Sequence, residues 1–276
     1  MVEMNVVTVG ALYCYPIKSC RGISLDVATV LATGLLQDRR WMLVNEQGKF
    51  ITQRDIPKIA LIVPALLESG LCVNAPNMPT LEVRGTSTAC PVKVMVWKDV
   101  CPAFDEGQDA AGWFSEFIGV PLRLVRFDDD FVRLSGRDWT ADIDAPNQFS
   151  DGFPFLAIGS ASLHDLNSRM TVPLPMDRFR PNLVLYGLEP YAEDNIDTLT
   201  SDALSLQAVK PCTRCKVTTV DQSTGLILST EPFSTLMKYR RHAALRGVTF
   251  GQNMILRAGV GSMLKVGQSL QVNYRA

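Results

Sequence analysis

Two cysteines stand three positions apart in the segment PCTRCKVTTVD, residues 211–221. A structural zinc site needs four ligands, commonly with a second pair of cysteines or histidines at a set spacing. The chain has two histidines, His164 and His242, and each lies alone, so a zinc site is not expected. A redox pair of the thioredoxin type belongs at a turn from a strand into a helix. Here the residues after Cys215 predict a strand, which argues against that interpretation.

A third interpretation gives the pair one chemical role, in which a single thiolate binds a soft metal held mainly by a non-protein group. Arg214 lies between the two cysteines, and its positive charge favours a thiolate. A purely structural pair is also open, although two cysteines around an arginine in a turn are an unusual choice for packing. The odd total of seven scattered cysteines does not predict a disulfide framework. Cys72, Cys90 and Cys101 are predicted to be small core residues.

Two segments near the N-terminus carry groups that suit an anion. In YPIKSCRG (residues 15–22), Lys18 supplies a compact positive charge and Ser19 a hydroxyl, a combination that fits a phosphate. QDRRW (residues 37–41) adds Arg39 beside a second arginine, one of which is expected to be solvated. Lysine and serine are common on loops, so neither segment is specific alone.

A third segment, DRFRPN (residues 177–182), places two arginines around Phe179. On an extended chain, Arg178 and Arg180 would point to the same side, away from the phenylalanine. Guanidinium groups suit phosphate or the flat heteroatom edge of a heterocycle, and Asn182 adds both a donor and an acceptor. The alternative is a charged strand edge. Taken together, the segments predict a site for an anionic, heterocyclic, metal-bearing cofactor, formed by Lys18, Ser19, Arg39, Arg180, Asn182 and Cys215.

The elements that must position these residues are mainly short strands. Apolar residues alternate with polar ones around Gly48, which predicts a hairpin over 40–52. Helical periodicity predicts helices over 109–119, over 162–170 with Ser162 as the cap, and over 230–241 with Thr230 as the cap. Further strands are expected over 71–75, 80–83, 92–97, 122–127, 155–160, 182–186, 204–209, 216–221 and 226–229. We therefore expect an α+β fold, mainly β, with two barrel-like halves.

Residues 128–153 are polar and rich in turns, and loops of this length are usually functional or disordered.

Composition excludes some classes of partner. The 276 residues carry a net charge of −1, with 47% hydrophobic and 20% charged residues, which gives no basis for binding nucleic acid or an anionic membrane. No apolar run approaches the roughly 20 residues that span a bilayer, and no signal peptide is recognised. A cytoplasmic protein is therefore expected.

Five of these motifs in order are specific where each alone is weak: YPIKSCRG, DRRW, FRPN, PCTRCKVTTVD and the late FGQN (residues 250–253). The chain resembles the MOSC proteins, and more closely the family of the mitochondrial amidoxime-reducing component and its bacterial relatives. The resemblance covers nearly the whole chain. It implies a MOSC N-terminal β-barrel domain over 1–122 and a MOSC β-barrel domain with a few helices over 123–276.

The same resemblance implies a molybdenum cofactor, a pterin dithiolene that holds molybdenum and ends in a phosphate. By its place in the motif, Cys215 would complete the coordination of the metal, and Cys212 would not. Asp151 falls where the family carries an acidic residue close to the metal, and it is a candidate proton donor. The residues matched to the phosphate and pterin are Lys18, Ser19, Arg39, Arg180, Asn182, Thr213 and Arg214.

The activity that the resemblance implies is reduction of N-hydroxylated compounds such as amidoximes, hydroxylamines and N-hydroxylated bases. The membrane anchor of the mitochondrial members and the ferredoxin-like domain of some bacterial relatives are not found in this sequence. Electrons are therefore expected from a separate protein, such as a ferredoxin, a cytochrome b5-like protein or a flavin reductase. Two alternatives are open. In a cofactor sulfurase, Cys215 would carry a persulfide, and in a cofactor carrier there would be no turnover.

Overall fold

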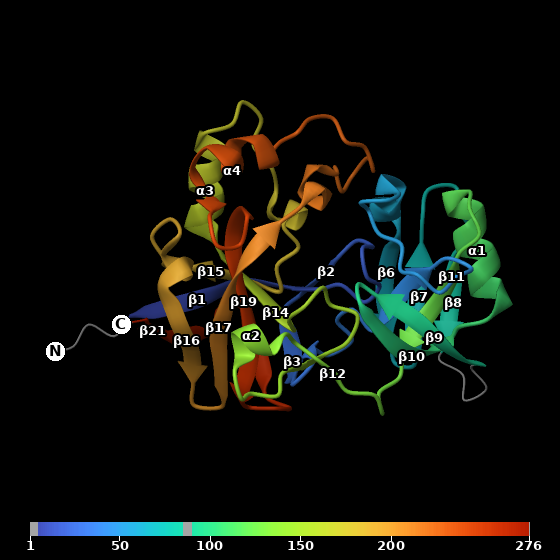
Figure 1. Cartoon of the computed structure of the whole chain (residues 1–276), viewed down its shortest axis with the longest axis horizontal. Coiled ribbons are helices and arrows are strands. Elements are labelled where there is room, and N and C mark those ends of the chain that lie inside the picture. The colour runs from blue at the N-terminus through green and yellow to red at the C-terminus, as the bar shows by residue number, and fades with distance from the viewer. Residues whose placement is uncertain (1–4, 85–89, 276) are drawn as a thin grey trace.

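The computed structural model describes residues 5–84 and 90–275, and it is mainly β, as the sequence predicts. The chain forms two neighbouring lobes, with the strands of a barrel in one lobe and smaller sheets with helix α1 in the other (Figure 1). Both chain ends of the described part lie on the barrel lobe. Among the described residues, no helix has the length and apolar character that a membrane crossing requires.

Seven strands close the larger barrel. They run in the order β14-β15-β1-β21-β16-β17-β19, and β19 pairs back with β14. Only β14 and β15 among these pairs are parallel. Two short strands, β2 (Ile23–Leu25) and β18 (Arg241–His242), extend the sheet beside β1 and β19. The barrel strands are β1 (Val6–Cys14), β14 (Phe155–Gly159), β15 (Leu183–Tyr186), β16 (Ile196–Ser201), β17 (Leu204–Arg214), β19 (Gly247–Ala258) and β21 (Ser269–Tyr274).

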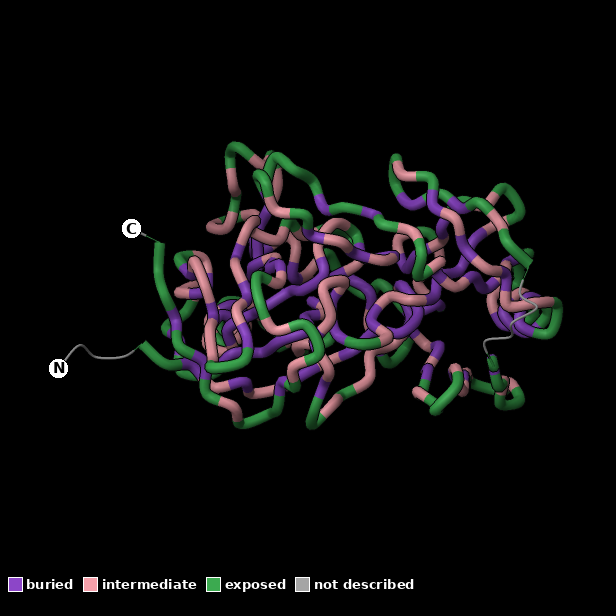
Figure 2. Tube along the Cα trace, turned by 90° about the horizontal axis from the view of Figure 1, so that it is seen from below, coloured by how far each residue is buried: buried purple, intermediate pink, exposed green. Residues whose placement is uncertain are grey.

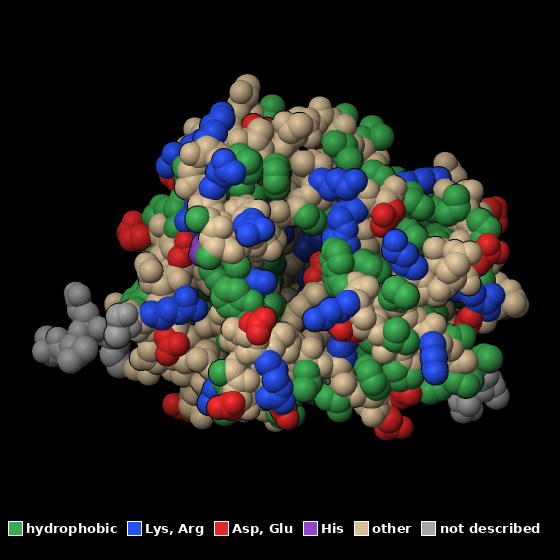
Figure 3. All heavy atoms as spheres, viewed as in Figure 1, with side chains coloured by type: hydrophobic (Ala, Val, Ile, Leu, Met, Phe, Trp, Pro, Cys, Tyr) green, Lys and Arg blue, Asp and Glu red, His purple; other side chains and the backbone are tan. Residues whose placement is uncertain are grey.

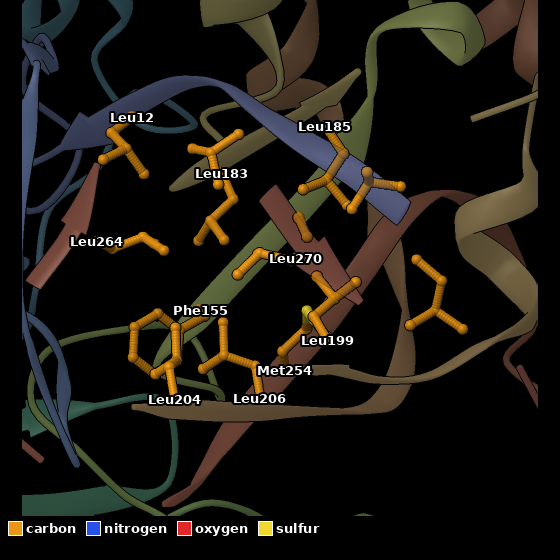
Figure 4. Close-up of a cluster of buried hydrophobic side chains, with 14 of the residues drawn as sticks. Leu12, Phe155, Leu183, Leu185, Leu199, Leu204, Leu206, Met254, Leu264 and Leu270 are labelled. Atoms are coloured by element: carbon orange, nitrogen blue, oxygen red, sulfur yellow. The ribbon is translucent and has the colours of Figure 1, made fainter. Parts of the chain in front are cut away.

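The barrel interior is a dry apolar core. Leu12, Leu183, Leu199, Leu206 and Leu270 are fully buried and point into it (Figure 4). Successive side chains of a strand point to opposite faces, so each strand contributes alternate residues. Full burial of one such side chain contributes roughly 1.5–3 kcal/mol, which makes the barrel a rigid frame for the loops at its rim.

The second lobe is built on a four-stranded sheet in the order β5-β11-β10-β9 and a three-stranded sheet β6-β7-β8. Helix α1 (Gln108–Ile118) covers it, burying Trp113, Phe114 and Phe117 as its helical period predicts. The buried chain runs through the middle of each lobe, and exposed turns lie outside (Figure 2). The strands are β5 (Trp41–Val44), β6 (Val63–Leu67), β7 (Gly70–Asn74), β8 (Leu81–Arg84), β9 (Cys90–Val96), β10 (Asp99–Asp105) and β11 (Arg123–Phe127).

Shorter elements connect the lobes or cover them. The remaining strands are β3 (Val27–Leu31), β4 (Gly34–Leu35), β12 (Arg133–Leu134), β13 (Pro146–Asn147) and β20 (Met263–Lys265). The remaining helices are α2 (Arg137–Thr140), α3 (Ser160–Ser168), α4 (Phe233–Tyr239) and the 3-10 helices η1 (Pro57–Leu61), η2 (Met176–Arg178), η3 (Ala192–Asn195) and η4 (Lys216–Thr219).

The N-terminal strand β1 belongs in space to the barrel formed by the C-terminal part, because it pairs with β15 and β21. The chain then crosses to the other lobe, where Ile17 bridges to Trp41. A boundary at residues 122 and 123 stays a prediction about the sequence.

Two predicted strands are wrong. Residues 216–219 form η4, because the Thr218 hydroxyl and amide both donate to the carbonyl of Cys215 and the Thr219 hydroxyl donates to that of Lys216. Over 226–229, Ile227 makes a single isolated bridge to Val220. The cysteine pair consequently lies at the end of strand β17 and not in a turn before a strand.

Three local predictions also need correction. The hydroxyl of Ser162 does not cap α3, which begins at Ser160; it donates to Glu193 instead. Thr230 does not cap α4, which begins at Phe233 after Pro232. Of the cysteines expected in the core, Cys101 is buried, Cys72 is half-buried and Cys90 is exposed.

Candidate active site

Cys215 is the exposed thiol of the pair. It follows the last residue of β17 and precedes η4, where its carbonyl anchors the tight turn. A guanidinium nitrogen of Arg54, Nη1, lies 3.8 Å from its Sγ. A free, exposed sulfur beside a cation, at the edge of a rigid strand, is available to a ligand.

Cys212 has a different environment. Its side chain is half-buried and packs against the apolar cluster that contains Phe179 and Phe250. Arg214 donates to its Sγ across 2.9 Å and to the carbonyl of Phe179 across 2.6 Å. Cys212 and Arg214 therefore fix the end of β17, and the two thiols are not equivalent.

Two predicted arginines meet over one aromatic ring. The guanidinium carbons of Arg39 and Arg180 lie 4.4 and 4.3 Å from the ring centre of Tyr15. Arg39 Nη2 donates to the carbonyl of Arg180, and Arg180 Nη1 donates to that of Cys20 across 2.7 Å. Burial lowers the pKa of Arg180, although an arginine stays charged at neutral pH. Arg39 also forms an ion pair with the buried carboxylate of Asp38, whereas no carboxylate of the described residues pairs with Arg180. Arg180 is therefore the cation of the two that has charge available for an anion.

Asn182 supports this arrangement. Its side-chain oxygen accepts from the Leu156 amide and from Arg39 Nη1, and its nitrogen donates to the carbonyl of Tyr13. The residue is buried, and these bonds hold β14 and β1 together while orienting Arg39. The structure gives Asn182 a positioning role, and its direct contact with a cofactor stays a prediction.

Arg178 does not share the surface of Arg180. It lies in η2, is buried, and donates to the Thr219 carbonyl and to Asp221 Oδ2 at 3.0 and 2.6 Å. The expectation of two arginines on one side of an extended segment is wrong, because this segment begins as a 3-10 helix. Arg40 is also directed elsewhere, pairing with Asp129.

Lys18 and Asp151 form an ion pair. Lys18 Nζ donates to Asp151 Oδ1 across 2.6 Å and to the Phe149 carbonyl across 2.7 Å. Burial lowers the pKa of Lys18 to about 8, although Asp151 opposes the shift. Partial removal from water raises the pKa of Asp151. The positive charges of Lys18 and Arg54 and the hydrogen bonds from Lys18 and Trp97 outweigh this effect and hold the pKa well below its usual range. Asp151 is thus ionised at neutral pH, and Lys18 carries the mobile proton.

The loop over 128–153 is held in place by the buried Arg133. Its guanidinium donates to Asp99 Oδ2 and to the carbonyls of Gln148 and Ser150, each across 2.8 Å. The last of these bonds fixes the residue next to Asp151. This polar segment is therefore ordered and presents the carboxylate.

Four residues of the site lie in the left-handed backbone region, which non-glycine residues seldom adopt. They are Ser19, Arg39, Trp97 and Arg180, with φ between 50° and 68°. Such conformations cluster at functional sites, where surrounding contacts enforce them. At Ser19, Gln53 donates to the carbonyl across 2.6 Å, and the side chain is half-buried. Thr213 is exposed on β17, two residues before Cys215.

The sequence did not predict several groups around the thiol and between the lobes. Arg54 reaches Cys215, its Cζ lies 4.6 Å from the ring of Trp97, and Trp97 Nε1 donates to Asp151 across 3.2 Å. The buried amides of Gln53 and Gln222 exchange two hydrogen bonds, of 3.0 and 2.9 Å. Nothing in their local sequence marks these residues, because their partners are distant along the chain.

A hollow with lysine and arginine side chains around it opens between the lobes (Figure 3). Beside Arg180, a cavity of about 420 Å³ lies between β1, β2 and η2. Tyr15, Arg21, Asp177, Arg180 and Gln222 line it. Burial raises the pKa of Asp177. Among the described residues, no three His, Cys, Asp or Glu side chains gather as the ligands of a metal ion would.

Comparison with known proteins agrees with this architecture. The model of the MOSC N-terminal beta barrel domain matches residues 6–121, and that of the MOSC domain matches residues 144–271. The chain is 37% identical to mitochondrial amidoxime-reducing component 1 of Mus musculus over 245 residues, covering 86% of this chain and 72% of the relative. It is 35% identical to mitochondrial amidoxime-reducing component 1 of Homo sapiens, covering 86% of this chain and 73% of the relative. For component 2 of Homo sapiens the identity is 34%, with the same coverage of 86% and 73%. The chain therefore belongs to the MOSC-domain family that includes the mitochondrial amidoxime-reducing components.

Proposed function

We propose that this protein is a molybdenum cofactor-dependent oxidoreductase that reduces N-hydroxylated compounds, namely amidoximes, hydroxylamines and N-hydroxylated bases. The observation that carries the proposal is the exposed thiol of Cys215 at 3.8 Å from Arg54, at the junction of two lobes rich in cations. The names of the relatives, amidoxime-reducing components, support the reaction class.

The residues present fit an anionic, metal-bearing pterin. Arg214 Nε and Ser150 Oγ are buried without a hydrogen-bond partner among the described residues, so both have capacity for a ligand. The cavity beside Arg180 has room for a ring system, and it combines cationic walls with one carboxyl, that of Asp177. A soft thiolate is the ligand type that suits this metal site.

In this proposal Cys215 is the protein ligand of molybdenum, and Arg54 donates to its sulfur. The charges and hydroxyls for the phosphate and pterin come from Lys18, Ser19, Arg39, Arg180, Thr213 and Arg214. Asn182 orients Arg39. Each charge-assisted bond to the phosphate is worth roughly 1.5–3 kcal/mol, so several of them retain the cofactor.

The cofactor, when bound, supplies a metal that can take an oxygen atom from an N–O bond and be returned to its starting state by two electrons. Overall, R–NH–OH, two protons and two electrons give R–NH₂ and water. The protein supplies protons and orientation. Lys18 Nζ, with a pKa of about 8, holds a transferable proton at neutral pH, and Asp151 Oδ1 keeps that proton at the site. Asp151 as the donor itself is the competing assignment.

The electrons are proposed to come from a separate electron-transfer protein, such as a ferredoxin, a cytochrome b5-like protein or a flavin reductase. The described cysteines do not gather into a cluster that could hold iron and sulfur. A cytoplasmic location is part of the same proposal.

The exposed thiol of Cys215 also suits a second function, transfer of sulfur as a persulfide. The experiment that separates the two is metal analysis of the protein purified from a host that makes the cofactor, followed by turnover of an amidoxime with reduced viologen. The proposal expects near-stoichiometric molybdenum and turnover. Protein without molybdenum would favour sulfur transfer, and molybdenum without turnover would favour a cofactor carrier.

A further inference from the structure

The hairpin between β9 and β10 carries a tryptophan whose ring contacts Arg54, the residue that reaches the thiol of Cys215. Val96 pairs with Asp99, so Trp97 and Lys98 form a two-residue turn. Trp97 has φ +55°, and turns of this kind favour glycine or asparagine where φ is positive. A bulky side chain is therefore held there against the local backbone preference, although 49% of it remains exposed.

Contacts on three sides fix the indole in this position. Its Nε1 donates to Asp151 Oδ1 across 3.2 Å. The guanidinium carbon of Arg54 lies 4.6 Å from the ring centre, and the ring of Phe50 lies 5.2 Å away. Arg54 in turn extends to 3.8 Å from the sulfur of Cys215. The indole, the carboxylate and the thiol thus belong to one continuous set of contacts.

We propose that Trp97 determines substrate specificity: the part of its indole that Arg54 and Phe50 leave exposed forms the wall on which a flat, conjugated N-hydroxylated compound stacks near Cys215. This inference rests on the proposed function. A planar π system gains from stacking on an aromatic ring, whereas a small aliphatic hydroxylamine has no such face. The substrates favoured by Trp97 are accordingly aryl amidoximes and N-hydroxylated heterocyclic bases.

The structure offers a matched control. Trp139 in α2 is another exposed tryptophan, 37% accessible, with a cation over its ring, Lys210 Nζ at 4.9 Å. It has no described contact with Cys215, Arg54 or Asp151. Replacing it removes an exposed indole and a cation contact of the same type at a different place in the structure.

The experiment compares Trp97→Ala, Trp97→Phe and Trp139→Ala, each loaded with cofactor, for benzamidoxime and N-methylhydroxylamine with reduced viologen as donor. Loss of a stacking contact lowers kcat/KM for benzamidoxime about tenfold in Trp97→Ala, and that for N-methylhydroxylamine by less than about twofold. Trp97→Phe keeps most of the benzamidoxime activity, and Trp139→Ala matches the parent. The dissociation constant of benzamidine, the product, rises in parallel in Trp97→Ala.

One further variant separates substrate recognition from a structural role of Trp97. If Trp97 recognises the substrate, Trp97→Gly relieves the strained turn, so the melting temperature stays close to that of the parent while the preference for benzamidoxime is lost. Equal losses for both compounds, or no loss in Trp97→Ala, overturn this inference while the proposed function stands. A parent without molybdenum and without turnover of either compound overturns the proposed function, and this inference with it.

Discussion

Arg54 Nη1 lies 3.8 Å from the Sγ of Cys215, although 161 positions separate the two residues. Arg54 comes from the lobe built on the smaller sheets, and Cys215 ends a barrel strand. The surroundings of the thiol are therefore completed only when the two lobes are docked correctly.

The amide pair of Gln53 and Gln222 should couple the stability of the two lobes. Either single change to leucine leaves a buried amide without its partner, which costs about 1–3 kcal/mol of unfolding free energy. In the double variant Gln53→Leu/Gln222→Leu, we expect a loss smaller than the sum of the singles by about 0.5–3 kcal/mol. Denaturant unfolding of the four proteins measures this coupling. Strict additivity would mean that the pair does not join the lobes energetically.

The anion site should lose cofactor when its charges are removed. Lys18→Ala and Arg180→Glu each delete a charge-assisted contact worth roughly 1.5–3 kcal/mol, or about ten- to a hundredfold in affinity. Molybdenum content after dialysis should fall in both. Arg40→Ala is the control, since Arg40 pairs with Asp129 instead. Unchanged occupancy in the double variant Lys18→Ala/Arg180→Glu would exclude these residues from cofactor binding.

Lys18 should titrate near pH 8 in the cofactor-free protein, because burial outweighs the attraction of Asp151. Asp151→Asn removes that attraction, so the pKa of Lys18 should fall further. The folded pKa lies below the ordinary value of 10.5, so the unfolded chain binds the proton more tightly. The cost to stability is full below about pH 8 and is relieved as the pH rises to about 10.5. NMR of ¹³C-labelled lysine side chains follows the titration, and a pKa near 10.5 would show that the attraction of Asp151 cancels the effect of burial.

Electron supply should require a second protein. The purified chain loaded with cofactor should not reduce a hydroxylamine with NADH alone, and adding a flavin reductase with an electron carrier should restore turnover. Oxidation of NADH at 340 nm reports the rate. Robust NADH-driven turnover by the single polypeptide would contradict the proposal.

Local patterns in the sequence predict much of the secondary structure. The helix over 109–119 is recognisable because Trp113, Phe114 and Phe117 recur at a helical period, and α1 buries all three. Gly48 closes the predicted turn, where its amide donates to the carbonyl of Asn45. The closure of the barrel cannot be read this way, since β14 pairs with β19 about a hundred positions later.

Short motifs in the sequence predict which segments carry candidate site residues, and they do not predict the contacts that depend on docking of the lobes. The structure brings the segments of Arg39 and Arg180 together, where Arg39 donates to the carbonyl of Arg180, and their role in binding a cofactor stays a prediction. Arg54 and Trp97 have no local signal in the sequence, because an arginine after a hairpin and a tryptophan at the end of a strand are common. Arg54 contacts Cys215 of the other lobe and Trp97 contacts Asp151, and the sequence carries no local sign of either contact.

The most direct test of the account is to compare Cys215→Ser with Cys212→Ser for molybdenum content, absorption and rate. Cys215→Ser replaces a soft ligand by a hard one, so some cofactor stays bound while the sulfur-to-metal absorption changes and the rate falls by orders of magnitude. Cys212→Ser should resemble the parent, because Cys212 only packs at the end of β17 and accepts from Arg214. Equal loss of activity in the two variants, with unchanged absorption in Cys215→Ser, would contradict a single thiolate ligand.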